Sequence, residues 1–302
     1  MRRLFAWLVP ALGSNTSLYV LKVLIWGSTW LAIEFQLGVV APEVSIVYRY
    51  VLASGVLFLY CLIRQLPLTF NLKHHLWFAV LGLFLFCLNY VFAYSAQIHI
   101  TSALAAIVFS MMVWINILLS RLIFGTRSSG RVIIGAILGI SGILLLFTPQ
   151  IGEVSLSDGV LIGLLLALLG AFSASCGNMV SQAAQQRKLP VMQANAWGMF
   201  YGAVLTALIA LVQGQAFTFD GTFTYIASLV YLAIFGSVVA FGAYLTLLGR
   251  IGAHRAGYAT VMFPVVALIL SMMFEGLELS VAIVLGTALV LLGNLLVLKG
   301  RP

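Results

Sequence analysis

Charged residues are scarce in this 302-residue chain, where Lys, Arg, Asp and Glu together make up 7% of the sequence. A water-soluble domain carries about 25% charged residues because its surface must face water. Hydrophobic residues make up 63% of the chain and the mean hydropathy is +1.15, which indicates an exterior in contact with lipid. The composition therefore excludes an ordinary soluble domain.

Motifs for metal, nucleotide and nucleic-acid binding are also missing. The three cysteines lie in apolar runs without ligand spacing and the four histidines are scattered, so we expect neither a metal site nor a disulfide. The chain has no GxxxxGK[ST] motif of the kind that ATP-driven pumps use. Its 15 basic residues form no dense patch, so the net charge of +8 does not indicate a nucleic-acid partner. Dispersed His, Asp and Glu argue against a membrane enzyme, and no cofactor is expected.

Long apolar runs dominate what is present. A membrane-spanning helix needs about 20 mostly apolar residues. Ten runs meet this requirement: 18–38, 44–64, 76–97, 102–122, 131–148, 158–183, 191–212, 223–248, 255–274 and 280–298. The sequence predicts an all-α membrane protein of ten transmembrane helices joined by short connections.

The charges separate across these spans. With the N-terminal segment in the cytoplasm, every basic residue except Arg49 lies on the inner side, as the positive-inside rule requires. The seven acidic residues fall at or near the outer side. This separation predicts that both termini are cytoplasmic.

The chain also resembles itself at an offset of about 150 residues. Residues 103–124 correspond to 253–274, and Tyr94 corresponds to Tyr244. The match predicts two five-helix repeats, 1–150 and 151–302, and an odd number of spans gives them opposite orientations. Inverted repeats are typical of secondary transporters, in which the two halves exchange conformations.

Several short motifs follow one another in a recognisable order. They are Trp26 Gly27 Ser28 Thr29 Trp30 in the first span, Tyr48 Arg49 Tyr50 in the second, Thr101 to Ala106 at the start of the fourth, its counterpart Ile251 to Ala256, and Met262 Phe263 Pro264 in the ninth, followed by Phe274 Glu275. In this order the chain resembles the EamA-type ten-helix branch of the drug/metabolite transporter superfamily. The resemblance implies a bacterial inner-membrane exporter of small molecules, in a branch that includes amino-acid exporters of the YddG type. The chain departs from the family pattern at Val113 Trp114, where proline is usual, and at Gly125, where an acidic residue is common.

Arg49, which lies within the second span, is the one basic residue not assigned to the inner side. A charge within the bilayer is costly and is usually paired or faces water. Glu34 lies at a similar depth in the first span, so we expect an Arg49–Glu34 ion pair that acts as a structural clamp or gate near the outer mouth. Direct contact with substrate is the alternative role.

Polar and aromatic residues in the middle and outer parts of the spans are the candidates for substrate binding. Unsatisfied polar groups are expensive in lipid, so each needs a partner helix, a cavity or a ligand. The candidates are Trp30, Asn89, Tyr90, Tyr94, Trp114, Asn178 and Tyr244. Packing of the rings and hydrogen bonds between helices are the alternative roles for these side chains. Trp26 shares one helix face with Trp30 and Glu34, and it carries the same two alternatives.

These candidates are neutral and aromatic, which favours export of a neutral or zwitterionic metabolite, with an amino acid, aromatic or otherwise neutral, fitting best. A multidrug exporter or a flippase for lipid-like molecules is the alternative function. No carboxylate lies deep in the membrane, so we expect transport down the substrate gradient with weak or no ion coupling. The expected partners are a small-molecule substrate and the lipid bilayer. The protein is expected to act as a monomer, with a dimer as the alternative.

Overall fold

The computed structural model describes residues 14–125, 130–153, 158–251, 263–274, 276 and 279–299, and every regular element within them is helical. The helices of the first part of the chain are α2 (Asn15–Glu34), α3 (Pro42–Ile63), α4 (Leu72–Leu81), η1 (Gly82–Leu88), α5 (Asn89–Gln97), α6 (Ser102–Phe109), α7 (Met112–Phe124) and α8 (Gly130–Glu153). Those that follow are α9 (Asp158–Gln186), α10 (Val191–Val212), α11 (Phe223–Tyr231), η2 (Leu232–Val239), α12 (Ala240–Ile251), α14 (Phe263–Phe274) and α15 (Val281–Lys299).

Seven helical segments in the described residues are long and apolar enough to cross a membrane. They are Asn15–Glu34, Pro42–Ile63, Leu72–Gln97, Ser102–Phe124, Gly159–Gln186, Val191–Val212 and Phe223–Arg250. Each overlaps one predicted span, which confirms a helical membrane protein. The other three predicted spans overlap α8, α14 and α15. The start of the span predicted at 255–274 and both termini lie outside the described residues, so the count of ten and the cytoplasmic termini stay predictions.

Helix starts follow local capping chemistry. The Asn71 side chain accepts a hydrogen bond from the His74 amide at the start of α4, and Thr222 accepts one from the Tyr225 amide at the start of α11. Such caps satisfy backbone N–H groups that have no partner within the helix. The two caps lie 151 residues apart, and each opens a helix that leads into a π-helical segment.

The two π-helical segments lie at equivalent places in the chain. η1 begins at Gly82 and η2 at Leu232, an offset of 150 residues. Within η2 the hydroxyl of Ser237 donates to the carbonyl of Leu232, five residues earlier. A π turn is wider than an α turn, and such segments occur frequently at functional sites.

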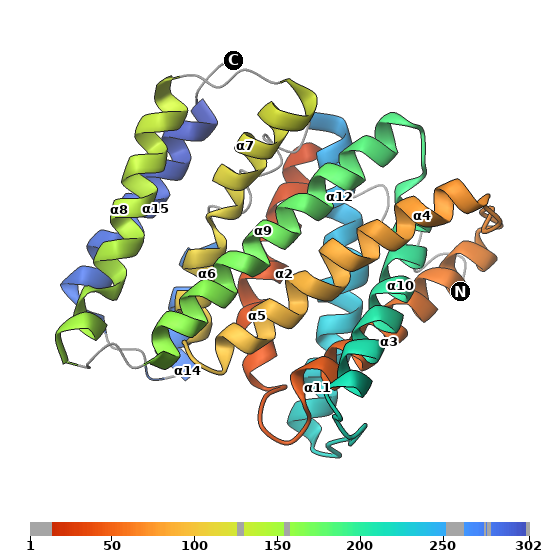
Figure 1. The fold of residues 1–302 in the computed structure, drawn as a ribbon, viewed down its shortest axis with the longest axis horizontal. Helices are drawn as coiled ribbons and strands as arrows, with labels where there is room; N and C mark the ends of the chain where they lie inside the picture. Colours follow the sequence, from red (N-terminus) through yellow and green to blue (C-terminus); the bar gives the residue numbers. More distant parts are fainter. Residues whose placement is uncertain are drawn as a thin grey trace.

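Helices α8 and α15 touch backbone to backbone at one end of the molecule, where Figure 1 shows them side by side. A Cβ added to Gly142 would lie 2.6 Å from the carbonyl oxygen of Gly286, and one added to Gly293 would lie 2.6 Å from that of Gly135. Only glycine allows so close an approach. The helices of the fifth and tenth predicted spans are therefore in close contact, and the contact is reciprocal.

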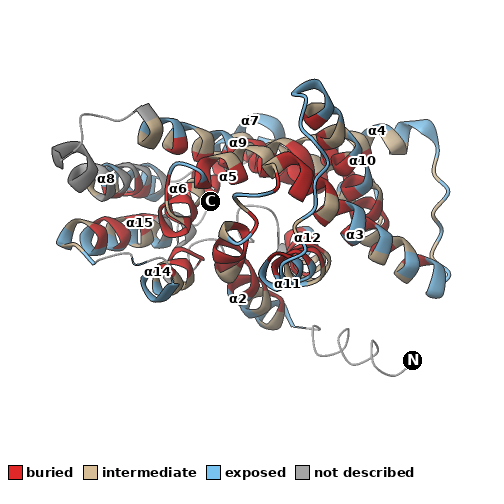
Figure 2. Cartoon of the chain, turned by 90° about the horizontal axis from the view of Figure 1, so that it is seen from below, coloured by how far each residue is buried: buried red, intermediate tan, exposed pale blue. Residues whose placement is uncertain are grey.

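The remaining helices form a bundle whose centre is buried. α3 packs along α10, and α2 packs against α12 and α14. Buried residues occupy the faces that the helices turn toward one another, and exposed residues occupy the outer faces (Figure 2). Many large apolar side chains are exposed on the outside, including Val212 and Phe223 at 88% and 86%, which suits an exterior solvated by lipid.

Candidate functional site

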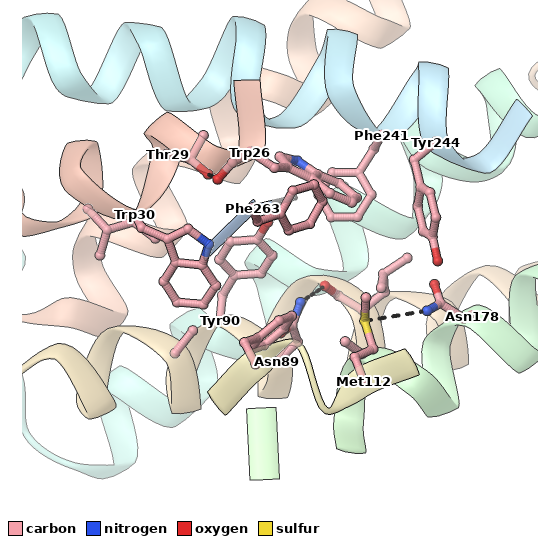
Figure 3. A pocket seen from close by; sticks show the side chains of 15 residues that line it. Trp26, Thr29, Trp30, Asn89, Tyr90, Met112, Asn178, Phe241, Tyr244 and Phe263 are labelled. Atoms are coloured by element: carbon pink, nitrogen blue, oxygen red, sulfur yellow. Dashed lines mark hydrogen bonds between the residues drawn. The ribbon is translucent and has the colours of Figure 1, made fainter. Parts of the chain in front are cut away.

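A small cavity lies at the centre of the bundle, among α2, η1, α5, α6, α7, α9, α12 and α14 (Figure 3). Fifteen side chains line it and seven of them are aromatic. Its volume is about 50 Å³, whereas pockets that hold small-molecule ligands typically measure about 300–1,000 Å³. The structure is therefore a closed state with room for water but not for an amino acid.

Five of the seven predicted substrate-binding residues line this cavity. They come from helices far apart in the sequence and are Trp30, Asn89, Tyr90, Asn178 and Tyr244. The other two lie elsewhere. Tyr94 is fully buried beside Arg49, and Trp114 packs against α8, where a Cβ on Gly139 would lie 3.1 Å from the indole nitrogen.

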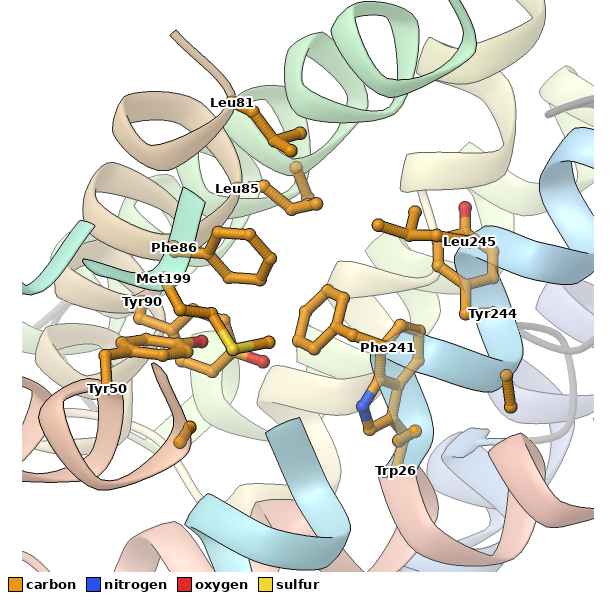
Figure 4. Close-up of a cluster of buried hydrophobic side chains, with 14 of the residues drawn as sticks. Trp26, Tyr50, Leu81, Leu85, Phe86, Tyr90, Met199, Phe241, Tyr244 and Leu245 are labelled. Atoms are coloured by element: carbon orange, nitrogen blue, oxygen red, sulfur yellow. The ribbon is translucent and has the colours of Figure 1, made fainter. Parts of the chain in front are cut away.

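Trp26 is the central ring of the cavity wall. Its ring centroid lies 4.7 Å from that of Phe241, 5.1 Å from that of Tyr244 and 5.6 Å from that of Phe263, all edge to face. Figure 4 shows Trp26, Phe241 and Tyr244 packed together in the buried cluster. The indole N–H of Trp26 donates to the carbonyl of Gly236, at 3.0 Å, in the π-helical segment η2. The ring is thus fixed by packing and by one hydrogen bond, and it forms a rigid wall for a ligand.

Three polar atoms near the cavity have no hydrogen-bond partner among the described residues. They are Asn89 Oδ1, Asn178 Oδ1 and the hydroxyl of Tyr244. The amide nitrogens of the two asparagines are occupied: Asn89 donates to the carbonyl of Leu85, and Asn178 donates to Asn116. Figure 3 shows the Tyr244 hydroxyl and the Asn178 amide turned toward each other, and the Tyr244 hydroxyl interacts with the side chains of Asn178 and Asn116. Buried polar atoms are nearly always satisfied in native structures, so water or a polar ligand can complete the hydrogen bonds of this group.

Arg49 takes different partners from those expected. Its Nε donates to Ser237 of η2 at 2.9 Å, and its terminal nitrogens lie 3.5 and 3.4 Å from the hydroxyls of Tyr94 and Tyr90. The guanidinium carbon also lies 4.4 Å from the centre of the Tyr90 ring. Among the residues that the structure describes, hydroxyls and rings therefore replace the carboxylate of Glu34, and the predicted ion pair is wrong. Position 49 faces η2 and α5, whereas Glu34 is the last residue of α2.

Lys22 is a site residue that the sequence reasoning missed. It is assigned above to the cytoplasmic side, yet it is completely buried in α2. Its ammonium lies 3.7 Å from the centre of the Tyr244 ring, 4.8 Å from that of Trp26 and 5.0 Å from that of Phe263. The available signal was spacing: Lys22 precedes Trp26 by four residues, as Trp26 precedes Trp30, so all three lie on one helix face.

Comparison with known proteins agrees with this picture. The EamA-like transporter family model matches residues 16–148 and again 161–299. An uncharacterized inner membrane transporter, YedA of Escherichia coli strain K12, is 28% identical over 98% of this chain and 93% of its own length. A probable amino-acid metabolite efflux pump of the same strain is 26% identical over 90% of this chain and 92% of its own.

A solved crystal structure has the same overall fold. It superposes with a TM-score of 0.71 at 21% identity and covers 94% of this chain and 96% of its own. With two matches of one family model spanning most of the chain, a central aromatic cavity and seven long apolar helices, this multi-pass protein of the bacterial inner membrane belongs to the EamA-like transporter family.

Proposed function

We propose that this chain is a secondary transporter that exports small metabolites, in particular neutral or zwitterionic amino acids including aromatic ones, across the inner membrane. The observation that carries the proposal is the central cavity, in which aromatic walls meet the free amide oxygens of Asn89 and Asn178. Rings bind an apolar side chain, and amide oxygens accept hydrogen bonds from an ammonium group. The relative named as a probable amino-acid metabolite efflux pump supports the same class of cargo.

The proposed architecture is ten transmembrane helices in two inverted halves, 1–150 and 151–302, with both termini in the cytoplasm. Three observations support it. One family model matches the chain twice, η1 and η2 recur at an offset of 150 residues, and the glycine contacts of α8 with α15 are reciprocal. A pseudo-two-fold axis between the halves accounts for all three.

The proposed mechanism is alternating access. A cavity of about 50 Å³ must expand before it admits an amino acid, so the helices around it separate on one side of the membrane at a time. α2, α12 and α14 contribute Trp26, Tyr244 and Phe263 to one wall, and movement of these helices apart would open that side. No carboxylate lines the cavity within the described residues, which supports transport without strict proton coupling.

Export of hydrophobic drugs is the second candidate function. The seven aromatic rings of the cavity favour it, because such rings bind flat apolar molecules without needing a specific polar group. The free oxygens of the asparagines favour the amino acid instead. In either case the proposed unit is a monomer in the bilayer.

The test is counterflow of labelled amino acids into proteoliposomes that contain the purified protein. Trp30→Ala and Tyr244→Ala remove cavity rings and should each slow exchange about five- to tenfold, because a lost aromatic contact of about 1–1.4 kcal/mol corresponds to that factor. Trp77→Ala is the control, since Trp77 packs under Arg187 away from the cavity. Exchange of a cationic drug with no exchange of any amino acid would overturn the proposal in favour of the multidrug function, and proton flux in fixed ratio to substrate would overturn the uncoupled mechanism.

A further inference from the structure

The ammonium of Lys22 lies behind the cavity wall, with no hydrogen-bonding counter-ion among the described residues. Its three nearest rings, Tyr244, Trp26 and Phe263, all line the cavity, while Lys22 itself lies immediately behind them. The side chain is fully buried, and its Nζ has no hydrogen-bond partner among the described residues. An ionisable residue inside a membrane is costly to keep and normally has a functional role.

The helices around Lys22 supply no carboxylate to neutralise it. α12 and α14 contain no Asp or Glu between Ala240 and Ile251 or between Phe263 and Phe274. On α2 itself the acidic residue is Glu34, twelve residues further along the helix and therefore about 18 Å away. Arg49, the other fully buried cation, has hydroxyl partners of its own. Within the described residues, the Lys22 ammonium lies against three aromatic rings and has no hydrogen-bond partner.

Rings stabilise a cation through their faces but accept no strong hydrogen bond. An ammonium has three N–H donors, and a carboxylate is the group that satisfies them best. Tyr244 carries the ring nearest to the Lys22 ammonium, and its hydroxyl faces Asn178 at the cavity, where it can turn its hydrogen toward an anion. The Lys22 ammonium therefore has unfilled donors next to a ring that lines the cavity.

We infer that Lys22 binds the carboxylate of the exported substrate and so selects acids over amines. This inference rests on the proposed amino-acid export. The carboxylate lies at the Lys22 and Tyr244 end, the substrate ammonium faces the free oxygens of Asn178 and Asn89, and the apolar side chain lies against Trp26 and the other rings. In this structure Trp26, Tyr244 and Phe263 separate Lys22 from the cavity. When the cavity expands, these three rings move apart and Lys22 reaches the substrate.

This arrangement has a consequence for specificity. A decarboxylated amine brings a positive charge and no partner for Lys22, so two cations would share one dry cavity. An acid that lacks the amino group keeps the main contact. The substrate class is therefore aromatic or large apolar carboxylates, amino acids included, and cationic drugs are excluded.

The experiment compares three molecules with one ring: phenylalanine, 3-phenylpropionate and phenethylamine. In counterflow of labelled phenylalanine, the wild-type protein should be inhibited by the two carboxylates and by phenethylamine on the order of 100-fold more weakly, as expected for loss of a buried charge pair. Lys22→Met should abolish this preference, while Lys22→Arg should keep it. Lys73→Met is the matched control, because Lys73 is exposed on α4 and should keep the wild-type order.

Quenching of tryptophan fluorescence by the same three molecules, in detergent, gives a second readout that needs no transport. Trp26 lies between Lys22 and the cavity, so binding at this site alters its emission. Unchanged preference for carboxylates in Lys22→Met would overturn the inference and leave the proposed function intact. Absence of any amino-acid exchange by wild-type protein would overturn the proposed function, and the quenching comparison would still decide the role of Lys22. Gain of phenethylamine binding in Lys22→Met would show that the variant is folded.

Discussion

Helices α2 and α3 each bury one cation completely, but the two surroundings differ. Arg49 on α3 donates to Ser237, lies within reach of the hydroxyls of Tyr90 and Tyr94, and stacks on a ring. Lys22 on α2 lies against three aromatic rings and has no hydrogen-bond partner within the described residues. A guanidinium is planar and weakly hydrated and can be satisfied by such neutral groups, whereas an ammonium is strongly hydrated and cannot.

The difference separates a structural role from a binding role. The Arg49 contacts connect α3 to α5 and η2, so they hold three helices together without an external partner. The Lys22 contacts hold the charge in place and leave its donors free. The comparison predicts opposite effects on stability when each charge is removed.

The largest effect is expected for Arg49→Met. This change leaves the hydroxyls of Ser237, Tyr90 and Tyr94 without their charged donor, and one hydrogen bond to a charged group contributes about 1.5–3 kcal/mol. We expect the free energy of unfolding, measured by SDS titration in mixed micelles, to fall by about 3 kcal/mol. Arg64→Met is the control, because Arg64 is exposed and should be close to neutral. Equal losses of unfolding free energy in the two variants would contradict the structural role of Arg49.

A smaller loss is expected for Ser237→Ala. The change removes the acceptor of the 2.9 Å bond from Arg49 Nε but leaves the tyrosines in place. The same titration should give a loss of about 1.5 kcal/mol. Ser54→Ala is matched in burial and in chemistry, because the Ser54 hydroxyl donates only to its own helix at Val51. A loss no greater than that of Ser54→Ala would contradict the connection between α3 and η2.

The smallest effect, with the opposite sign, is expected for Lys22→Met. Methionine keeps the shape of the side chain and removes a charge that has no counter-ion among the described residues, and such replacements stabilise by about 1 kcal/mol or more. The free energy of unfolding should therefore rise. Lys22→Ala is the companion variant, because it removes the packing as well and should destabilise. A fall in stability in Lys22→Met as large as that in Arg49→Met would erase the distinction between the two cations.

The sequence predicted the helical membrane fold and part of the cavity wall for clear physical reasons. Hydropathy marks a span because lipid tolerates few charges, and a spacing of four residues places Trp26 and Trp30 on one face. The sequence did not indicate which neighbouring helices each face meets. The pairing of Arg49 with Glu34 therefore rested only on their similar depth in the membrane. The sequence also did not distinguish a buried lysine from a cytoplasmic one. Lys22 lies near the end of a span, where both positions are compatible with the charge pattern. The π-helical segments are invisible to hydropathy, because the same apolar residues fill an α turn.

The contact between α8 and α15 gives a fixed reference distance within the molecule. Two backbones in direct contact through Gly135, Gly142, Gly286 and Gly293 cannot slide without a clash, so their separation stays constant while other helices move. Neither helix contributes a residue to the cavity. Spectroscopic labels at Ile137 and Val284, both exposed, would therefore keep one distance through a transport cycle. Displacements of α2 or α12 could then be measured against that pair within the same molecule.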